Sequence, residues 1–124
     1  MPALLIKNVI LNNERKDIYI KDGKIETISG NIELNADRVI DGKGKNAVPG
    51  FVNMHTHAAM TLMRGIGEDI SLMDWLQNII WPTETRLTDE LVYWGTKLAC
   101  VEMIKSGTTC FNDQYWNLPA AVAA

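Results

Sequence analysis

The stretch Pro49-Gly50-Phe51-Val52-Asn53-Met54-His55-Thr56-His57 decides how the rest of this sequence is interpreted. A Pro-Gly turn leads into a mostly apolar run, which predicts a strand buried on both faces. Alternate residues of a strand point to one face, so His55 and His57 share a face with Phe51 and Asn53. Their Cα atoms are then expected to lie about 6.6–7 Å apart. Two imidazoles at this spacing can converge on one metal ion at about 2.0–2.1 Å each.

These two histidines are the only ones among the 124 residues, and they fall at the carboxyl end of the predicted strand. A His-x-His pair alone is weak evidence, because hydrogen-bonded or surface histidines can have the same spacing. In a barrel of parallel strands, however, active sites are built on the inward face at the carboxyl ends of the strands. The pattern therefore makes His55 and His57 candidate metal ligands.

Helical patterns follow this strand. Ser71 can cap a helix that carries apolar residues at helical spacing, and Pro82 is expected to end it. Thr88 begins a second, longer helix, and Gly107 supplies its left-handed stop. The stripe predicted to be buried on this longer helix consists of Leu91, Trp94, Leu98, Val101 and Ile104.

A β-prone run over residues 108–111 follows the longer helix at once. The order strand, helices, strand predicts a βαβ unit with a parallel sheet. Asp113, at the end of the second strand, is placed to face the same site, but the pattern assigns it no role. Another helix is predicted to start near Leu118-Pro119, since proline suits a first helical turn.

The first part of the chain reads as a small sheet without catalytic chemistry. Leu4 to Leu11 is an apolar run, and Asp22-Gly23 separates two β-prone segments, which is a strong signal for a hairpin. Residues 38–40 predict another short strand. A polar, glycine-rich turn over residues 41–46 then leads to the decisive stretch.

The composition is that of an ordinary globular protein, with 47% hydrophobic and 22% charged residues. The net charge of -3 argues against a nucleic-acid partner, and no Lys/Arg run suggests membrane contact. No apolar run approaches the ~18 residues of a spanning helix, and the first residues lack the features of a signal peptide. Cys100 and Cys110 are expected to be reduced thiols, so we expect a cytoplasmic protein.

Residues 49–57 also resemble the first barrel strand of the amidohydrolase superfamily, and residues 39–44 resemble its usual lead-in from a small β-sandwich. Further stretches resemble its nucleoside-deaminase and chlorohydrolase branch: Met60-Thr61-Leu62-Met63-Arg64-Gly65, Trp75-Leu76 and Ile80-Trp81-Pro82-Thr83-Glu84. The similarity is strongest to the 5'-methylthioadenosine/S-adenosylhomocysteine deaminases, and it spans essentially all 124 residues.

The resemblance implies an α/β fold, namely the start of a metal-dependent (β/α)8 TIM barrel preceded by part of a small β-sandwich. Residues 1–48 would belong to the N-terminal β-sandwich, and residues 49–124 would form the first two β/α units of the barrel. Because such a barrel needs about 250 residues, the fold is expected to be incomplete in this chain.

The resemblance also implies one divalent metal held by His55 and His57, with Zn2+ expected and Fe2+ or Mn2+ as alternatives. The family's other ligands and its proton-moving residues come from later strands, so no catalytic acid or base is expected here. Glu84 would bind the ribose hydroxyls, since a carboxylate can accept two hydrogen bonds from a cis-diol. From surface preference alone, Glu84 would instead be a solvated loop acid. Trp81, its near neighbour in sequence, would pack in the core or line an apolar pocket.

The function implied is hydrolytic deamination of adenosine-type nucleosides, which converts 5'-methylthioadenosine or S-adenosylhomocysteine to inosine analogues and ammonia. Other members of the branch are alternatives: a guanine or cytosine deaminase, or a triazine chlorohydrolase. A rival interpretation is that the 124 residues alone are an inactive fragment that needs a second chain. The expected partners are a small-molecule nucleoside and either further copies of the chain or a missing C-terminal portion.

Overall fold

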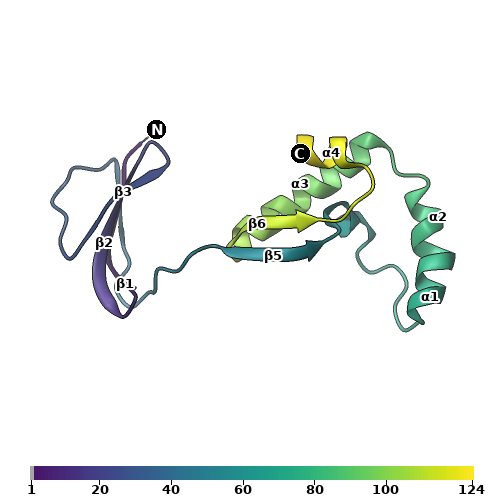
Figure 1. Cartoon of the computed structure of the whole chain (residues 1–124), viewed down its shortest axis with the longest axis horizontal. Helices are drawn as coiled ribbons and strands as arrows, with labels where there is room; N and C mark the ends of the chain where they lie inside the picture. Colours follow the sequence, from purple (N-terminus) through teal and green to yellow (C-terminus); the bar gives the residue numbers. More distant parts are fainter. Residues whose placement is uncertain (1) are drawn as a thin grey trace. The chain divides into compact units, whose positions relative to one another are not determined.

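The computed structural model describes residues 2–124, which divide into two compact units. One unit ends at Pro49 and the other spans Gly50–Ala124 (Figure 1). This division lies one residue after the boundary expected from the sequence. The assignment of the two parts to a β-sandwich and to a barrel remains a prediction.

The first unit is a four-stranded sheet in the order β3-β2-β1-β4. Its pairs are antiparallel except that β4 runs parallel to β1. The hairpin predicted at Asp22-Gly23 is confirmed, since φ is 50° and 75° at these residues and Lys21 pairs with Lys24. A second tight turn at Asn12 and Asn13 also uses positive φ. The strands are β1 (Leu4–Leu11), β2 (Glu14–Lys21), β3 (Lys24–Ser29) and β4 (Arg38–Asp41).

A buried carboxylate organises the core of this unit. Asp17 is 2% exposed, and its two oxygens accept hydrogen bonds from the backbone N–H groups of Asn8 (2.9 Å) and Ile32 (3.0 Å). Burial raises the pKa of Asp17, but these two donors and the nearby Lys7 ammonium outweigh it, so the pKa is lowered. Asp17 therefore ties the loop that carries Ile32 to the sheet.

The second unit is built on two parallel strands with helices between them, which confirms the βαβ order. Figure 1 shows α3 packed along the β5–β6 pair and α4 following β6. Within residues 2–124, every helix is too short or too polar to span a membrane. The elements are β5 (Phe51–Thr56), the 3-10 helix η1 (Ala58–Met63), α1 (Leu72–Trp75), the π-helix η2 (Leu76–Ile80), α2 (Trp81–Glu84), α3 (Asp89–Ser106), β6 (Thr108–Asp113) and α4 (Leu118–Ala123).

The expectation that Pro82 ends its helix is wrong. The helical path continues from α1 through η2 into α2, and Pro82 lies in the first turn of α2. Proline lacks a backbone N–H, but a first-turn position does not require one. The change of hydrogen-bond pattern at the preceding π segment creates such a position. As a result, the helical path continues two residues past Pro82 and ends at Glu84.

The buried stripe predicted for α3 is also wrong. All five predicted residues are at least 43% exposed, with Ile104 at 73%. The buried face instead carries Val92, Gly95, Thr96 and Ala99. This face is buried because the backbones of α3 and η1 pack closely together. A Cβ at Gly95 would lie 2.6 Å from the carbonyl oxygen of Ala59. The predicted ends are confirmed, with Thr88 as the N-cap and Gly107 at φ 90°.

Candidate active site

The two imidazoles at the end of β5 point toward one another. The Nε2 atoms of His55 and His57 are 3.2 Å apart, and the rings meet edge to face with an interplanar angle of 88°. Both side chains are exposed. The sequence therefore predicted correctly that these rings share one face of the strand.

This arrangement fits a divalent metal ion. Two ligand nitrogens that each lie 2.0–2.1 Å from one ion at a near-tetrahedral angle are separated by about 3.3 Å. The observed 3.2 Å between His55 and His57 agrees with that separation. Among residues 2–124, no group of three or more His, Cys, Asp and Glu side chains gathers to hold a metal. Since a catalytic zinc takes three protein ligands, the pair alone would supply only part of such a site.

The orientation of His57 is set by the strand beside it. Its Nδ1 lies 2.6 Å from the carbonyl oxygen of Gln114, just after β6. A carbonyl can only accept, so Nδ1 carries the hydrogen and Nε2 keeps its lone pair for a metal. The N–H of Gln114 donates to the carbonyl of Thr56 at 2.8 Å. Sequence analysis missed Gln114, because a main-chain acceptor has no side-chain signature.

Glu84 and His57 line the same cavity, which has a volume of about 240 Å³. Glu84 comes from the end of α2, and His57 follows β5. The wall between them is largely apolar and includes Met60, Trp75 and Trp81. The indole N–H of Trp75 donates to the carbonyl of Ile66 at 3.0 Å, which holds that ring in place. The structure thus places the predicted sugar-binding carboxylate and one predicted metal ligand in the lining of one cavity.

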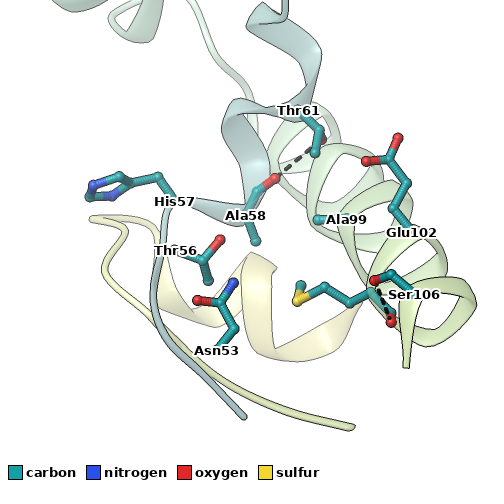
Figure 2. A pocket seen from close by; sticks show the side chains of 9 residues that line it. Asn53, Thr56, His57, Ala58, Thr61, Ala99, Glu102 and Ser106 are labelled. Carbon is teal, nitrogen blue, oxygen red and sulfur yellow. Dashed lines mark hydrogen bonds between the residues drawn. The ribbon is translucent and has the colours of Figure 1, made fainter. Parts of the chain in front are cut away.

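A second cavity, of about 370 Å³, also has His57 among its lining residues. Figure 2 shows its lining between β5 and α3, with Asn53, Thr56 and Ala58 facing Ala99 and Glu102. The ring of His57 points away from these side chains (Figure 2). His57 therefore lines this larger cavity without directing its ring at the other labelled side chains.

Tyr115 is a buried neighbour of Glu84 that the sequence did not indicate. Its ring belongs to the core cluster with Ala59 and Val92. Its hydroxyl is buried beside the Glu84 side chain. Burial and the Glu84 carboxylate raise the pKa of Tyr115 well above its usual range, so the phenol stays neutral.

Comparison with known proteins identifies the family. The sequence model of the amidohydrolase family matches residues 46–123. This chain therefore belongs to the amidohydrolase family.

Over the aligned region, about half of the positions are identical between this chain and its curated relatives. A 5'-deoxyadenosine deaminase of Methanocaldococcus jannaschii is 52% identical over an alignment of 124 positions, which covers 98% of this chain and 29% of that protein. A 5-methylthioadenosine/S-adenosylhomocysteine deaminase of Thermococcus sibiricus is 47% identical over an alignment of 128 positions, which covers 98% of this chain and 30% of that protein. The chain thus spans about 30% of the length of the curated relatives it matches.

Solved structures show the same fold. An adenosine deaminase from Xanthomonas campestris with bound zinc superposes with a TM-score of 0.84 at 32% identity, covering 97% of this chain and 30% of that one. An atrazine chlorohydrolase from Arthrobacter aurescens TC1 complexed with zinc gives a TM-score of 0.78 at 22% identity, with 97% and 32% covered. The second likeness shows the fold alone. The α/β fold expected for this chain is therefore confirmed as part of an amidohydrolase.

Proposed function

We propose that this chain supplies two metal ligands and the sugar-binding carboxylate of a hydrolase that deaminates adenosine-type nucleosides. The substrates proposed are 5'-methylthioadenosine and S-adenosylhomocysteine, and the products are the inosine analogues and ammonia. The observation that carries the proposal is the shared cavity of His57 and Glu84. The curated deaminases that resemble the chain support it, although they are much longer proteins.

His55 and His57 would hold the metal through their Nε2 atoms, and their 3.2 Å separation supports this assignment. A divalent metal, when bound, supplies a Lewis acid that makes hydroxide available near neutral pH. We favour zinc because imidazole suits it and because similar solved structures contain it, with Fe2+ or Mn2+ as alternatives. The other ligands would come from polypeptide outside these 124 residues, either a C-terminal portion or a further copy of the chain.

Glu84 would accept hydrogen bonds from the two ribose hydroxyls. With the sugar held there, the adenine ring is directed toward His57 across the apolar wall. Trp75 and Trp81 offer aromatic faces for the base. Besides supplying metal ligands, this chain would therefore orient the nucleoside. Such orientation lowers the entropic part of the activation free energy of the reaction.

The reaction is a hydrolysis in which water adds at C6 of the adenine ring and ammonia leaves from the same carbon. The acid and base that move protons are proposed to lie outside this chain, as are the remaining strands of a (β/α)8 barrel. Residues 49–124 would be the first two β/α units, and the preceding sheet would be part of a β-sandwich. We also propose a cytoplasmic location, which the two free cysteines support.

A substrate panel tests this function on purified protein that contains the chain. The panel comprises 5'-methylthioadenosine, S-adenosylhomocysteine, 5'-deoxyadenosine, adenosine, guanine, cytosine and atrazine, with release of ammonia or chloride as the readout. We expect the adenosine-type nucleosides to have the highest kcat/KM. A preference for guanine, cytosine or atrazine would overturn the assignment of Glu84 as a sugar ligand, because none of these carries a ribose.

A further inference from the structure

The carboxylate of Asp113 reaches across from β6 to the residue that follows His57. Its Oδ1 accepts a hydrogen bond from the backbone N–H of Ala58 at 2.9 Å, over a sequence separation of 55 residues. Asp113 also pairs with Thr56 as the last register partner of the two parallel strands. The side chain therefore lies next to the turn that presents the imidazole of His57.

This contact replaces a missing local cap. Ala58 is the first residue of η1, and His57 stands at the N-cap position with φ -123° and ψ 74°. No side chain at the N-cap accepts a hydrogen bond from this helix. The first N–H groups of a helix have no partner within it, so they need an acceptor from elsewhere. Asp113 provides that acceptor for Ala58.

Three hydrogen bonds connect residues 56–58 with residues 113–114, and we call them the His57 clamp. Besides the Asp113 contact, the clamp contains the Gln114 N–H to Thr56 carbonyl bond at 2.8 Å. Its third member joins His57 Nδ1 to the Gln114 carbonyl at 2.6 Å. Two of these bonds use only the main chain of Gln114. Apart from the imidazole of His57 itself, the Asp113 carboxylate is thus the side chain on which the clamp depends.

Burial of the second carboxylate oxygen of Asp113 lowers the stability of the fold. Oδ2 is buried and has no hydrogen-bond partner among residues 2–124. A buried polar atom without a partner lowers stability, so an apolar residue would be the better choice for packing alone. The irregular register between Asn53 and Thr56 shows that the strand is distorted just before the clamp. Such distortions serve to re-aim side chains beside active sites.

We propose that Asp113 is a positioning residue that sets the ring of His57 for metal binding. By holding the N–H of Ala58, it limits rotation of the backbone at His57, and the Gln114 carbonyl can then fix the ring. The inference rests on the proposed metal site, because it concerns how one of the two ligands is oriented. Groups that orient metal ligands in this indirect way typically change metal affinity by about 10- to 100-fold when removed.

The test compares zinc affinity, measured by competition with a chelator, among variants of the purified protein that contains this chain. Asp113→Ala and Asp113→Leu remove the acceptor, and Leu keeps a similar volume in case the smaller side chain prevents folding. Asp113→Asn retains an oxygen that can accept from Ala58. Asp17→Ala is the matched control, because Asp17 also accepts from backbone N–H groups but belongs to the other compact unit.

We expect zinc affinity to fall about 10- to 100-fold in the Ala and Leu variants and to recover most of that loss in the Asn variant. The visible spectrum of the cobalt-substituted protein should shift in the same two variants, and Asp17→Ala should leave both readouts unchanged. Zinc affinity equal to that of the unsubstituted protein in Asp113→Ala or Asp113→Leu would overturn the inference. An equal loss in Asp17→Ala would also overturn it, since the effect would then be general destabilisation.

A further variant separates this inference from the proposed function. His57→Ala should lose zinc whether or not Asp113 has a positioning role. If His57→Ala binds zinc as tightly as the unsubstituted protein, the metal site itself is wrong, and the role of Asp113 fails with it. If His57→Ala loses zinc while Asp113→Ala does not, only the positioning role is wrong.

Discussion

The Nε2 atoms of His55 and His57 lie 3.2 Å apart at the end of β5. The alternation of side chains along a strand brings the two rings to one face. The hydrogen bond from His57 Nδ1 to the carbonyl of Gln114 then orients the His57 ring so that its Nε2 faces the Nε2 of His55. Two nitrogen lone pairs that face each other at this distance repel unless a proton or a metal ion lies between them.

Removing either imidazole should therefore remove the metal. We expect His55→Ala and His57→Ala to lose more than about 100-fold in zinc affinity, because direct ligands matter more than the residues that orient them. Metal analysis after dialysis measures this loss directly. A chelator should abolish the proposed deaminase activity of protein that contains the unsubstituted chain, and added zinc should restore it. Full zinc content in both alanine variants would contradict the proposed centre.

Replacing Glu84 by Gln should weaken nucleoside turnover without loss of metal. A hydrogen bond to a charged group contributes about 1.5–3 kcal/mol, so kcat/KM should fall roughly 10- to 150-fold. On a substrate that lacks both ribose hydroxyls, the Glu84→Gln substitution should leave kcat/KM almost unchanged. Glu90→Gln, an exposed acid in the first turn of α3, is the control. Equal losses on substrates with and without the diol would argue against sugar binding by Glu84.

A methyl group at Gly95 should destabilise the second unit. The new Cβ would lie 2.6 Å from the carbonyl oxygen of Ala59, and this backbone atom cannot move aside like a flexible side chain. We expect Gly95→Ala to lower the free energy of unfolding by about 1–3 kcal/mol, measured by urea denaturation followed by tryptophan fluorescence. Gly30→Ala is the matched control, because a Cβ at Gly30 meets nothing within 4 Å. No difference between the two variants would show that η1 and α3 are not closely packed.

Acid should weaken the first unit through Asp17. Because its pKa is lowered in the folded protein, Asp17 contributes stability above the ordinary carboxyl pKa, and this contribution is lost as the pH falls through the lowered value. Hydrogen exchange at the amides of Asn8 and Ile32 should therefore accelerate at acid pH, after correction for intrinsic rates. Asp17→Asn should remove most of this pH dependence, whereas Glu26→Gln on exposed β3 should retain it. An unchanged pH profile in Asp17→Asn would refute the assignment.

Local rules account for the parts of the fold that were predicted correctly. The Asp22-Gly23 hairpin, the Thr88 cap and the Gly107 stop each depend on the conformational preferences of one or two residues. The errors concern the buried face of α3, where longer-range packing decides, and Pro82, where the preceding π segment creates a first-turn position. The large apolar residues of α3 suggested a buried face, but close contact between Gly95 and Ala59 favours the face with small side chains.

The amino-acid sequence by itself determined that His55 and His57 share a face, because side-chain alternation along a strand needs no information from elsewhere. It also identified Glu84 through resemblance, without placing it near either histidine. Only the tertiary structure decided that Glu84 and His57 line one cavity and that Asp113 and Gln114 hold the turn after β5. These relationships join residues 27 to 57 positions apart in the sequence, and such pairs meet only when the helices and the parallel strands pack together.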